Sequence, residues 1–497
     1  MTYQALENHF EEIHHLGHAA AIIGWDEAAM MPVGGGEARA GAMAALEVIS
    51  HQKKTDPRIS EWIEKANNEA LNEWQQSNLE QIKRASRLAS ALPEELVRAM
   101  SESRSQCEQA WRVLRAENNW QDFAPLLEEV VRVTREEAQC RAEHANLEPY
   151  DALLDVYEPG LNSTTVEKLF APLRSAIPDL LAEILGRQSD ATPLAGPFSV
   201  TDQKAVGIEF MKRLGFNFEH GRLDVSHHPF CGGVPDDVRI TTRYSEDDFT
   251  QSLLGVLHET GHALYEQGLP EKWRKQPVGS ALSMAVHESQ SLFIEMQLCR
   301  SRAFVKFATP ILREQLGGTS SSSPSWQEDN LHKIFTQVRP DYIRVDADEV
   351  TYPMHIVLRF ELEQALIAGT MEVKDIPEAW NAKMEEYLGV NTLGNDANGC
   401  MQDVHWPAGL FGYFPTYTLG AMTAAQFYAA MENKIPDAEE QVSRGEFGQI
   451  VAWLRENVHS KGCLMDQDTL MQSVTGSSLS ADAFLQHLRR RYIDGER

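Results

Sequence analysis

The chain has 497 residues, of which 42% are hydrophobic and 24% are charged, a composition typical of globular proteins. Its formal net charge of −28 argues against a nucleic-acid partner, because nucleic-acid binding needs basic surfaces that displace counterions. The same charge repels anionic membrane surfaces, and no apolar run approaches the roughly 20 residues that span a bilayer. We therefore expect no association with nucleic acid or membrane.

The cysteines and the first residues predict a location in the cell. The six cysteines are widely spaced and form no CxxC pair. This pattern is typical of free thiols in a reducing compartment and disfavours a cysteine-based zinc site. The N-terminal stretch MTYQALENHFEEIHH lacks the basic and apolar regions of a secretion signal. The sequence therefore predicts a cytoplasmic protein.

Most segments show helical periodicity. Residues 60–92 carry charged side chains at the spacings of a solvated helix face, which predicts one long helix. Thr164 and Glu167 form a capping-box pattern that predicts the start of another helix. The breaker-rich stretches 189–197 and 317–325 are short enough to be loops rather than domain linkers. We therefore treat residues 1–497 as a single unit, which can divide into two helical lobes.

Strand patterning is sparse and is clearest at residues 238–244, VRITTRY. Hydrophobic or β-branched residues alternate there with arginine and threonine, which predicts a strand. An amphipathic stretch follows at once, with Ser245 as the predicted N-terminal cap, Asp248 as the residue that completes the cap, and Gly268 as a candidate end. The predicted fold class is mainly α, with one small β-sheet beside this helix.

That helix contains the sequence HETGH. Residues at i and i+4 lie on one helix face, so His258 and His262 can direct two imidazoles at one point. Glu259 is rotated by about 100° from His258 and can reach a water held by a metal from the side. The H-E-x-x-H spacing is typical of zinc peptidases, in which the carboxylate is the general base.

The alternative explanation of this motif is coincidence. Chance gives on the order of 0.05 such matches in a chain of this length. The apolar stretch LLGVL precedes the motif and indicates that the helix is buried. Two buried histidines beside a buried glutamate are costly unless they share a partner, which favours a metal.

A catalytic zinc site needs a third protein ligand and an open position. Residues 280–301 form a second apolar helical stretch that contains Glu288, with His287 and Glu295 as rival ligands. An acid on an apolar face is costly unless it is paired or ligating. An antiparallel return of this helix can present Glu288 to the histidine pair, so Glu288 is the favoured third ligand.

Several short motifs together resemble the M32 family of metallocarboxypeptidases, the carboxypeptidase Taq type. They occur in the family's order along nearly the whole chain: HPF (228–230), DVRIT (237–241), HETGH (258–262), HESQ (287–290), IRVDAD (343–348), GCMQDVHW (399–406) and GYFPTYTLG (412–420). Each motif alone is weak, but the ordered set is specific.

This resemblance implies a saddle-like helical body with a deep central groove, similar to angiotensin-converting enzyme and neurolysin. It implies one divalent ion per chain, zinc or alternatively cobalt, held by His258, His262 and Glu288. It further implies Glu259 as catalytic base and proton donor, removal of C-terminal residues from peptides with broad specificity, and a homodimer.

A carboxypeptidase must recognise a free carboxylate, which the planar guanidinium of arginine binds well. Arg344 is the favoured contact and Arg239 a supporting one, although each can instead form a structural ion pair with a nearby acid. Four further residues can donate a hydrogen bond to the oxyanion, or can instead be packing residues: His228, His405, Tyr413 and Tyr417. Asp348 or Asp403 is expected to orient a ligand histidine.

Two alternative functions compete with the zinc carboxypeptidase. An oligopeptidase or dipeptidyl-type zinc peptidase would use the same motif on internal or penultimate bonds. A non-catalytic peptide-binding protein would hold a structural metal, but such a site has no use for a proton acceptor at Glu259.

Overall fold

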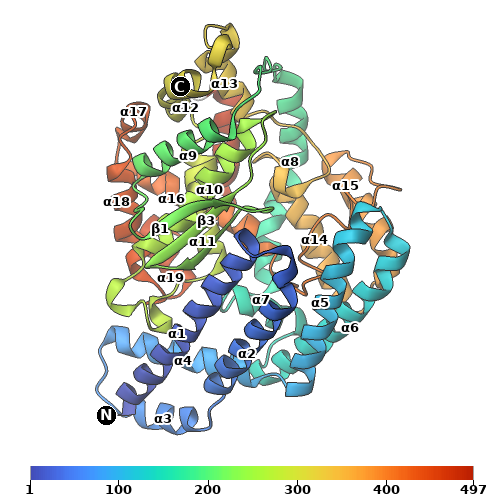
Figure 1. Cartoon of the computed structure of the whole chain (residues 1–497), viewed down its shortest axis with the longest axis vertical. Coiled ribbons are helices and arrows are strands. Elements are labelled where there is room, and N and C mark those ends of the chain that lie inside the picture. The colour runs from blue at the N-terminus through green and yellow to red at the C-terminus, as the bar shows by residue number, and fades with distance from the viewer. Residues whose placement is uncertain (1, 496–497) are drawn as a thin grey trace.

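The structure, a computed structural model, describes residues 2–495 and is mainly helical with one small sheet among them. Figure 1 shows the sheet near the centre, with the first four helices on one side of it. The predicted fold class of helices around one small sheet is confirmed. No helix within residues 2–495 is long and apolar enough to cross a membrane.

The N-terminal helices have a small core of their own. They are α1 (Thr2–Ala29), α2 (Gly36–Lys54), α3 (Arg58–Ala66) and α4 (Glu73–Ser90). Leu6, Phe10 and Leu79 belong to this core. The single helix predicted over residues 60–92 is wrong, because the chain breaks after Ala66. Asn72 then starts α4 through a capping box, in which its side chain binds a backbone N–H that a continuous helix would need.

A second group of helices leads to the sheet: α5 (Glu94–Ala116), α6 (Trp120–Ala145), α7 (Pro149–Tyr157), α8 (Ser163–Arg187) and α9 (Val200–Leu214). The cap of α8 is Asn162, whose side chain accepts from the backbone N–H of Thr165 at 2.9 Å, rather than the predicted Thr164. Asparagine favours this position because its short side chain reaches the free N–H groups of the first turn.

The sheet has the order β1-β3-β2 and combines β1 (Gly221–Val225), β2 (Phe230–Val234) and β3 (Asp237–Thr242). β3 pairs with β1 in parallel and with β2 antiparallel. It matches the predicted strand but ends two residues earlier. Val238 and Ile240 are fully buried on one face of β3, where α10 (Phe249–Gly268) packs.

The start of α10 differs from the prediction, whereas its end agrees. Asp248 is the cap, because its carboxylate accepts from the backbone N–H and the hydroxyl of Thr250 at 2.8 and 2.6 Å. Ser245 instead accepts from the backbone N–H of Asp247 and stabilises the preceding turn. Gly268 is the last helical residue, as predicted.

The remaining helices complete the main hydrophobic core: α11 (Met284–Leu292), α12 (Arg302–Leu316), α13 (Glu328–Phe335), α14 (Tyr352–Ile367), α15 (Ile376–Leu388), α16 (Pro415–Lys434), α17 (Ala438–Ser443), α18 (Gly448–Asn457), α19 (Gln467–Thr475) and α20 (Asp482–Arg489). A π-helical segment, Phe293–Leu298, follows α11 directly. Such segments are frequent at functional sites because they re-aim side chains.

Two glycines allow α10 and α16 to approach α11 closely. A Cβ atom on Gly261 would lie 2.3 Å from the carbonyl oxygen of Gln290, and one on Gly420 would lie 2.7 Å from the Cβ of Glu288. Neither position can hold a larger residue without separating the helices. These contacts place the HETGH turn directly over α11.

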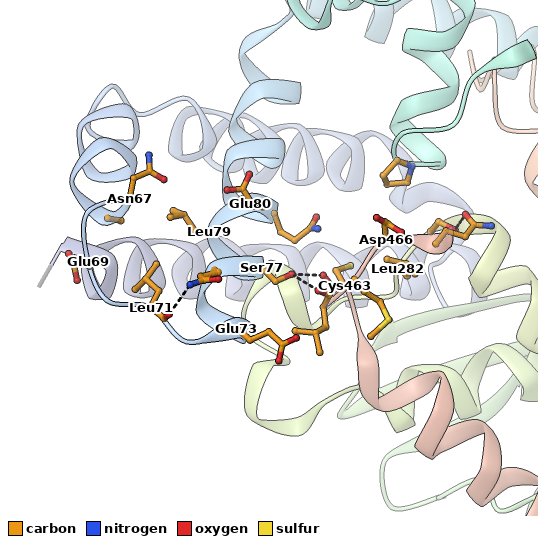
Figure 2. Close-up of a pocket in the computed structure, with 18 residues that line it drawn as sticks. Asn67, Glu69, Leu71, Glu73, Ser77, Leu79, Glu80, Leu282, Cys463 and Asp466 are labelled. Atoms are coloured by element: carbon orange, nitrogen blue, oxygen red, sulfur yellow. Dashed lines mark hydrogen bonds between the residues drawn. The ribbon is translucent and has the colours of Figure 1, made fainter. Parts of the chain in front are cut away.

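A cavity of about 730 Å³ lies between α4 and the segment 463–467 (Figure 2). Ser77 bridges its two sides by donating to the carbonyl oxygens of Cys463 and Leu464 at 2.8 and 3.1 Å. None of the predicted site residues lines it. The cavity is therefore separate from the motifs that carry the predicted chemistry.

Candidate metal centre and active site

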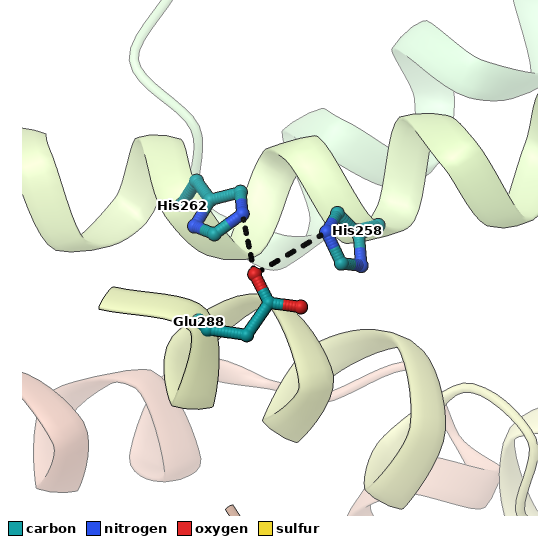
Figure 3. A group of neighbouring side chains, drawn as sticks. All are labelled: His258, His262 and Glu288. Carbon is teal, nitrogen blue, oxygen red and sulfur yellow. Dashed lines mark ion pairs between the residues drawn. The ribbon is translucent and has the colours of Figure 1, made fainter. Parts of the chain in front are cut away.

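The two motif histidines and Glu288 meet at one point. His258 and His262 project from α10 toward Glu288 on α11 (Figure 3). The Glu288 Oε2 atom lies 3.4 Å from His262 Nε2 and 3.9 Å from His258 Nε2. These three residues are a group whose ligand atoms all lie within 4.8 Å of one another, and the rivals His287 and Glu295 are not part of it.

This geometry fits a metal ion. Ligand atoms about 2.0–2.2 Å from a tetrahedral zinc ion lie about 3.4 Å from one another. The Nδ1 atoms of both histidines are already engaged: His258 Nδ1 lies 3.0 Å from Glu295 Oε2, and His262 Nδ1 lies 3.0 Å from the His287 carbonyl oxygen. Both Nε2 atoms therefore remain to face the shared point, and the Nδ1 contacts hold the rings in that orientation, as is typical of histidines that bind metals.

The electrostatics of this site also favour a cation. Burial opposes protonation of His258, but Glu288 and Glu295 outweigh it and raise its pKa to about 9. For Glu295, burial opposes ionisation, yet Arg300 and His258 lower the pKa to about 2. Burial lowers the pKa of His262 to about 4, so this ring is neutral and its Nε2 atom can accept a metal ion. Burial also opposes ionisation of Glu288, but the two histidines lower its pKa below the usual range, so an ionised carboxylate faces both Nε2 atoms.

The structure corrects the prediction that Asp348 or Asp403 orients a ligand histidine. Glu295 has this position for His258, because its carboxylate contacts both His258 Nδ1 and Arg300. Asp348 instead accepts from backbone N–H groups, including that of Thr351 at 3.0 Å. Glu295 lies seven residues after Glu288, or about two helical turns. That spacing is the signal in the sequence that could have identified it.

Glu259 is adjacent to the metal-binding group without belonging to it. Its side chain is 6% exposed, and its Oε2 atom has no hydrogen-bond partner among residues 2–495. Burial, with a contribution from the negative charge of Glu288, raises its pKa to about 7. A buried carboxylate with a free oxygen and a pKa near neutrality is suited to accept and return a proton.

Arg344 is connected to this group through two tyrosine rings. The Tyr352 hydroxyl is 3.5 Å from Glu288 Oε1, and the Tyr352 and Tyr417 ring centroids are 6.3 Å apart. The Arg344 guanidinium lies over the Tyr417 ring at 4.7 Å. Tyr352, which the sequence motifs did not single out, therefore links the metal-binding group to the candidate carboxylate contact.

The predicted hydrogen-bond donors gather around Arg344. His405 Nε2 lies 3.0 Å from the Tyr417 hydroxyl, and the Tyr413 ring packs against Tyr417 at 5.3 Å. Burial raises the pKa of Tyr417 to about 12, so its hydroxyl keeps its proton at neutral pH. His228 lies in the loop between β1 and β2, where burial and then the positive charge of Arg344 lower its pKa. The structure therefore brings these four residues into one neighbourhood.

Arg239 is placed differently from Arg344. It forms a two-point ion pair with Asp237 at 2.9 and 2.7 Å, the structural alternative considered for it. Its guanidinium lies 4.4 Å from the centre of the Trp25 ring on α1. Arg239 therefore contacts α1 on the side of β3 that faces away from α10. Its supporting role in carboxylate binding remains a prediction, while its contacts show that it joins the sheet to α1.

Comparisons with known proteins agree with this geometry. The family model for carboxypeptidase Taq (M32) metallopeptidase matches residues 5–492. The chain belongs to the M32 metallopeptidases.

This M32 chain is 40% identical to thermostable carboxypeptidase 1 of Thermus thermophilus over 99% of its own length and 98% of the relative's. It is 34% identical to carboxypeptidase 1 of Bacillus subtilis, with 97% and 96% covered. Among solved structures, Trypanosoma cruzi metallocarboxypeptidase 1 superposes with a TM-score of 0.96 at 41% identity, covering 99% of both chains. The predicted family, fold and activity as a metallocarboxypeptidase are confirmed.

We expect Glu295→Gln to weaken metal binding by about 10–100-fold, the usual effect of losing a carboxylate that orients a ligand histidine. This variant keeps the three candidate ligands His258, His262 and Glu288, but the His258 ring loses its charged partner at Nδ1. Titration with a competing chelator measures the change. Glu314→Gln, an exposed position on α12, is the control. An unchanged metal affinity in Glu295→Gln would contradict the orienting role.

Proposed function

We propose that this metallocarboxypeptidase uses one zinc ion, or alternatively cobalt, held by His258, His262 and Glu288. The donor set supports zinc, because two histidines and a glutamate with an open fourth position are the ligands of zinc peptidases. When bound, the ion polarises the scissile carbonyl and acidifies a water molecule. Metal analysis of purified protein is expected to find one equivalent per chain.

The residues around the ion have separate tasks in the proposed reaction. Glu259 accepts the proton of the attacking water on its free Oε2 atom and then returns a proton to the departing amine. The hydroxyls of Tyr413 and Tyr417 and the rings of His228 and His405 are the candidates that donate to the carbonyl oxygen as negative charge develops. The His405–Tyr417 hydrogen bond holds two of them in place.

The single observation that carries the proposal of C-terminal specificity is the position of Arg344. Its guanidinium is 5% exposed and stacks on Tyr417, which contacts the Tyr352 ring beside Glu288. An extended residue spans only about 3.5 Å, so a group that binds the terminal carboxylate must lie close to the metal. Arg344 lies in the same buried neighbourhood as Glu288 and Glu259, since the charges of all three act on the Tyr417 hydroxyl. A peptide held by Arg344 would present its last peptide bond to Glu259.

The test compares a peptide that has a free C-terminus with its amidated form. Wild-type protein is expected to cleave only the free acid, one residue at a time, as seen by mass spectrometry. Equal cleavage of the amidated peptide would favour the oligopeptidase alternative. A protein that binds zinc but cleaves neither peptide would favour the non-catalytic alternative.

Arg344→Met is expected to lower kcat/KM for the free acid by about 10²-fold. Losing one partner of a buried charge pair costs about 3 kcal/mol, which corresponds to this factor. Steady-state kinetics on the free acid measures the change. Arg339→Met, at an exposed position five residues earlier, is the control. An Arg344 variant with wild-type kinetics would remove Arg344 from the substrate site.

We also propose a cytoplasmic homodimer with broad side-chain preference for peptides. All six cysteines are free, which supports a reducing compartment. The dimer and the broad preference rest on the resemblance to M32 carboxypeptidases. Light scattering after gel filtration is expected to give twice the chain mass of 55.8 kDa.

A further inference from the structure

Two buried arginines share the carboxylate of Asp403, and one of them is Arg344, the proposed contact for the substrate carboxylate. Arg344 donates from Nε to Asp403 Oδ1 at 3.0 Å, and its Nη2 lies 2.9 Å from the same oxygen. Arg359, on α14, donates from Nε to Asp403 Oδ2 at 2.8 Å, and its Nη2 contacts the same oxygen. Each guanidinium therefore takes one oxygen of Asp403.

The two arginines differ in what remains after this pairing. Arg359 is 0% exposed, and its Nη1 donates to the His355 carbonyl oxygen, so all three of its nitrogens are engaged. Within residues 2–495, no hydrogen bond involves Nη1 of Arg344. Arg344 thus keeps one nitrogen for a ligand, whereas Arg359 is enclosed by protein and cannot touch substrate.

The charge of this group follows from its three members. Both arginines are protonated at neutral pH: the pKa of Arg359, lowered chiefly by burial, is still about 10. Burial disfavours the Asp403 carboxylate, but the two arginines outweigh it and hold its pKa far below the usual range. Two cations and one anion leave one positive charge, and His405, next to Asp403, is neutral because burial lowers its pKa to about 3.

We propose that Arg359 is a positioning residue that acts through Asp403 to preserve the positive charge of Arg344 for the substrate carboxylate. Without Arg359, Asp403 would neutralise Arg344, and the pair would attract an anion only as a dipole. With Arg359 present, Asp403 still orients Arg344 by hydrogen bonds, while the group as a whole stays cationic. This inference rests on the proposed binding of a free C-terminus by Arg344.

The net charge of the three residues can be changed and then restored by substitution. A purely structural role of Arg359 does not predict that KM follows this charge. Arg359→Met makes the group neutral and is expected to raise KM for a free-acid peptide by about 10–100-fold, with kcat changed less than about threefold. The double variant Arg359→Met with Asp403→Asn restores one positive charge. Its asparagine oxygen still accepts from Arg344. KM is expected to return to within severalfold of wild type.

Two further measurements keep the test decisive if Arg359→Met folds poorly. Thermal unfolding and zinc content establish whether each variant is intact. Arg359→Lys retains the positive charge but loses the two-nitrogen contact with Asp403, so it is expected to recover most of the rise in KM seen in Arg359→Met, because Arg359 acts through its charge. A double variant no better than Arg359→Met, or a lysine variant with an equally raised KM, would overturn the proposal.

The amidated peptide separates this inference from the proposed function. If wild-type protein cleaves the amide as well as the acid, C-terminal recognition itself fails, whatever Arg359 does. If wild type discriminates but Arg359→Met keeps its KM and its discrimination, only the role of Arg359 is wrong.

Discussion

Replacing Glu259 by glutamine is expected to lower kcat by about 10³-fold while the proposed zinc ion stays bound, because general-base catalysis contributes factors of this size. The amide has nearly the shape of the carboxylate but cannot accept the proton of the attacking water. Glu259 is not one of the three clustered ligands, so the site retains its donors. Kinetics and metal analysis on the same preparation measure both expectations.

The control for Glu259→Gln is the same change at Glu271, an exposed residue just beyond α10. This variant is expected to match wild type in kcat and zinc content. If Glu259→Gln retained full activity, the proton transfer would have to involve another group. If it lost its zinc, the lost activity would no longer report on the base.

Replacing His262 by alanine is expected to remove one ligand and to lower kcat/KM by at least about 10³-fold. A metal supplies several kcal/mol of transition-state stabilisation, and each loss of about 1.4 kcal/mol lowers the rate by a factor of ten. Zinc content is expected to fall below one equivalent per chain, since only His258 and Glu288 remain. Zinc analysis after dialysis and peptide kinetics measure these effects.

Added zinc is expected to restore part of the His262→Ala activity, because two ligands and Glu259 are still in place. His144→Ala, at an exposed position on α6, is the control and is expected to keep both zinc and activity. Full zinc content in the His262 variant would exclude His262 as a ligand.

Local patterns predicted the features that depend on neighbouring residues. The spacing of HETGH predicted that His258 and His262 point to one place, because helix periodicity alone puts residues i and i+4 on one face, and the structure brings both to Glu288. The alternation in VRITTRY likewise predicted β3. The predictions of helix starts were less successful. The caps are Asp248 instead of Ser245 and Asn162 instead of Thr164, and Asn72 starts a new helix within the stretch 60–92 that was predicted to be continuous.

The sequence by itself determined the family, the helical class and the metal-binding motif, since these follow from ordered motifs and short-range periodicity. Only the tertiary structure decided how distant residues divide their tasks. Glu295 contacts His258, which lies 37 residues earlier in the sequence. Asp403 contacts Arg344 and Arg359, which lie 59 and 44 residues earlier. These contacts depend on how closely buried helices approach, as Gly261 and Gly420 permit, and spacing along the chain does not encode that approach.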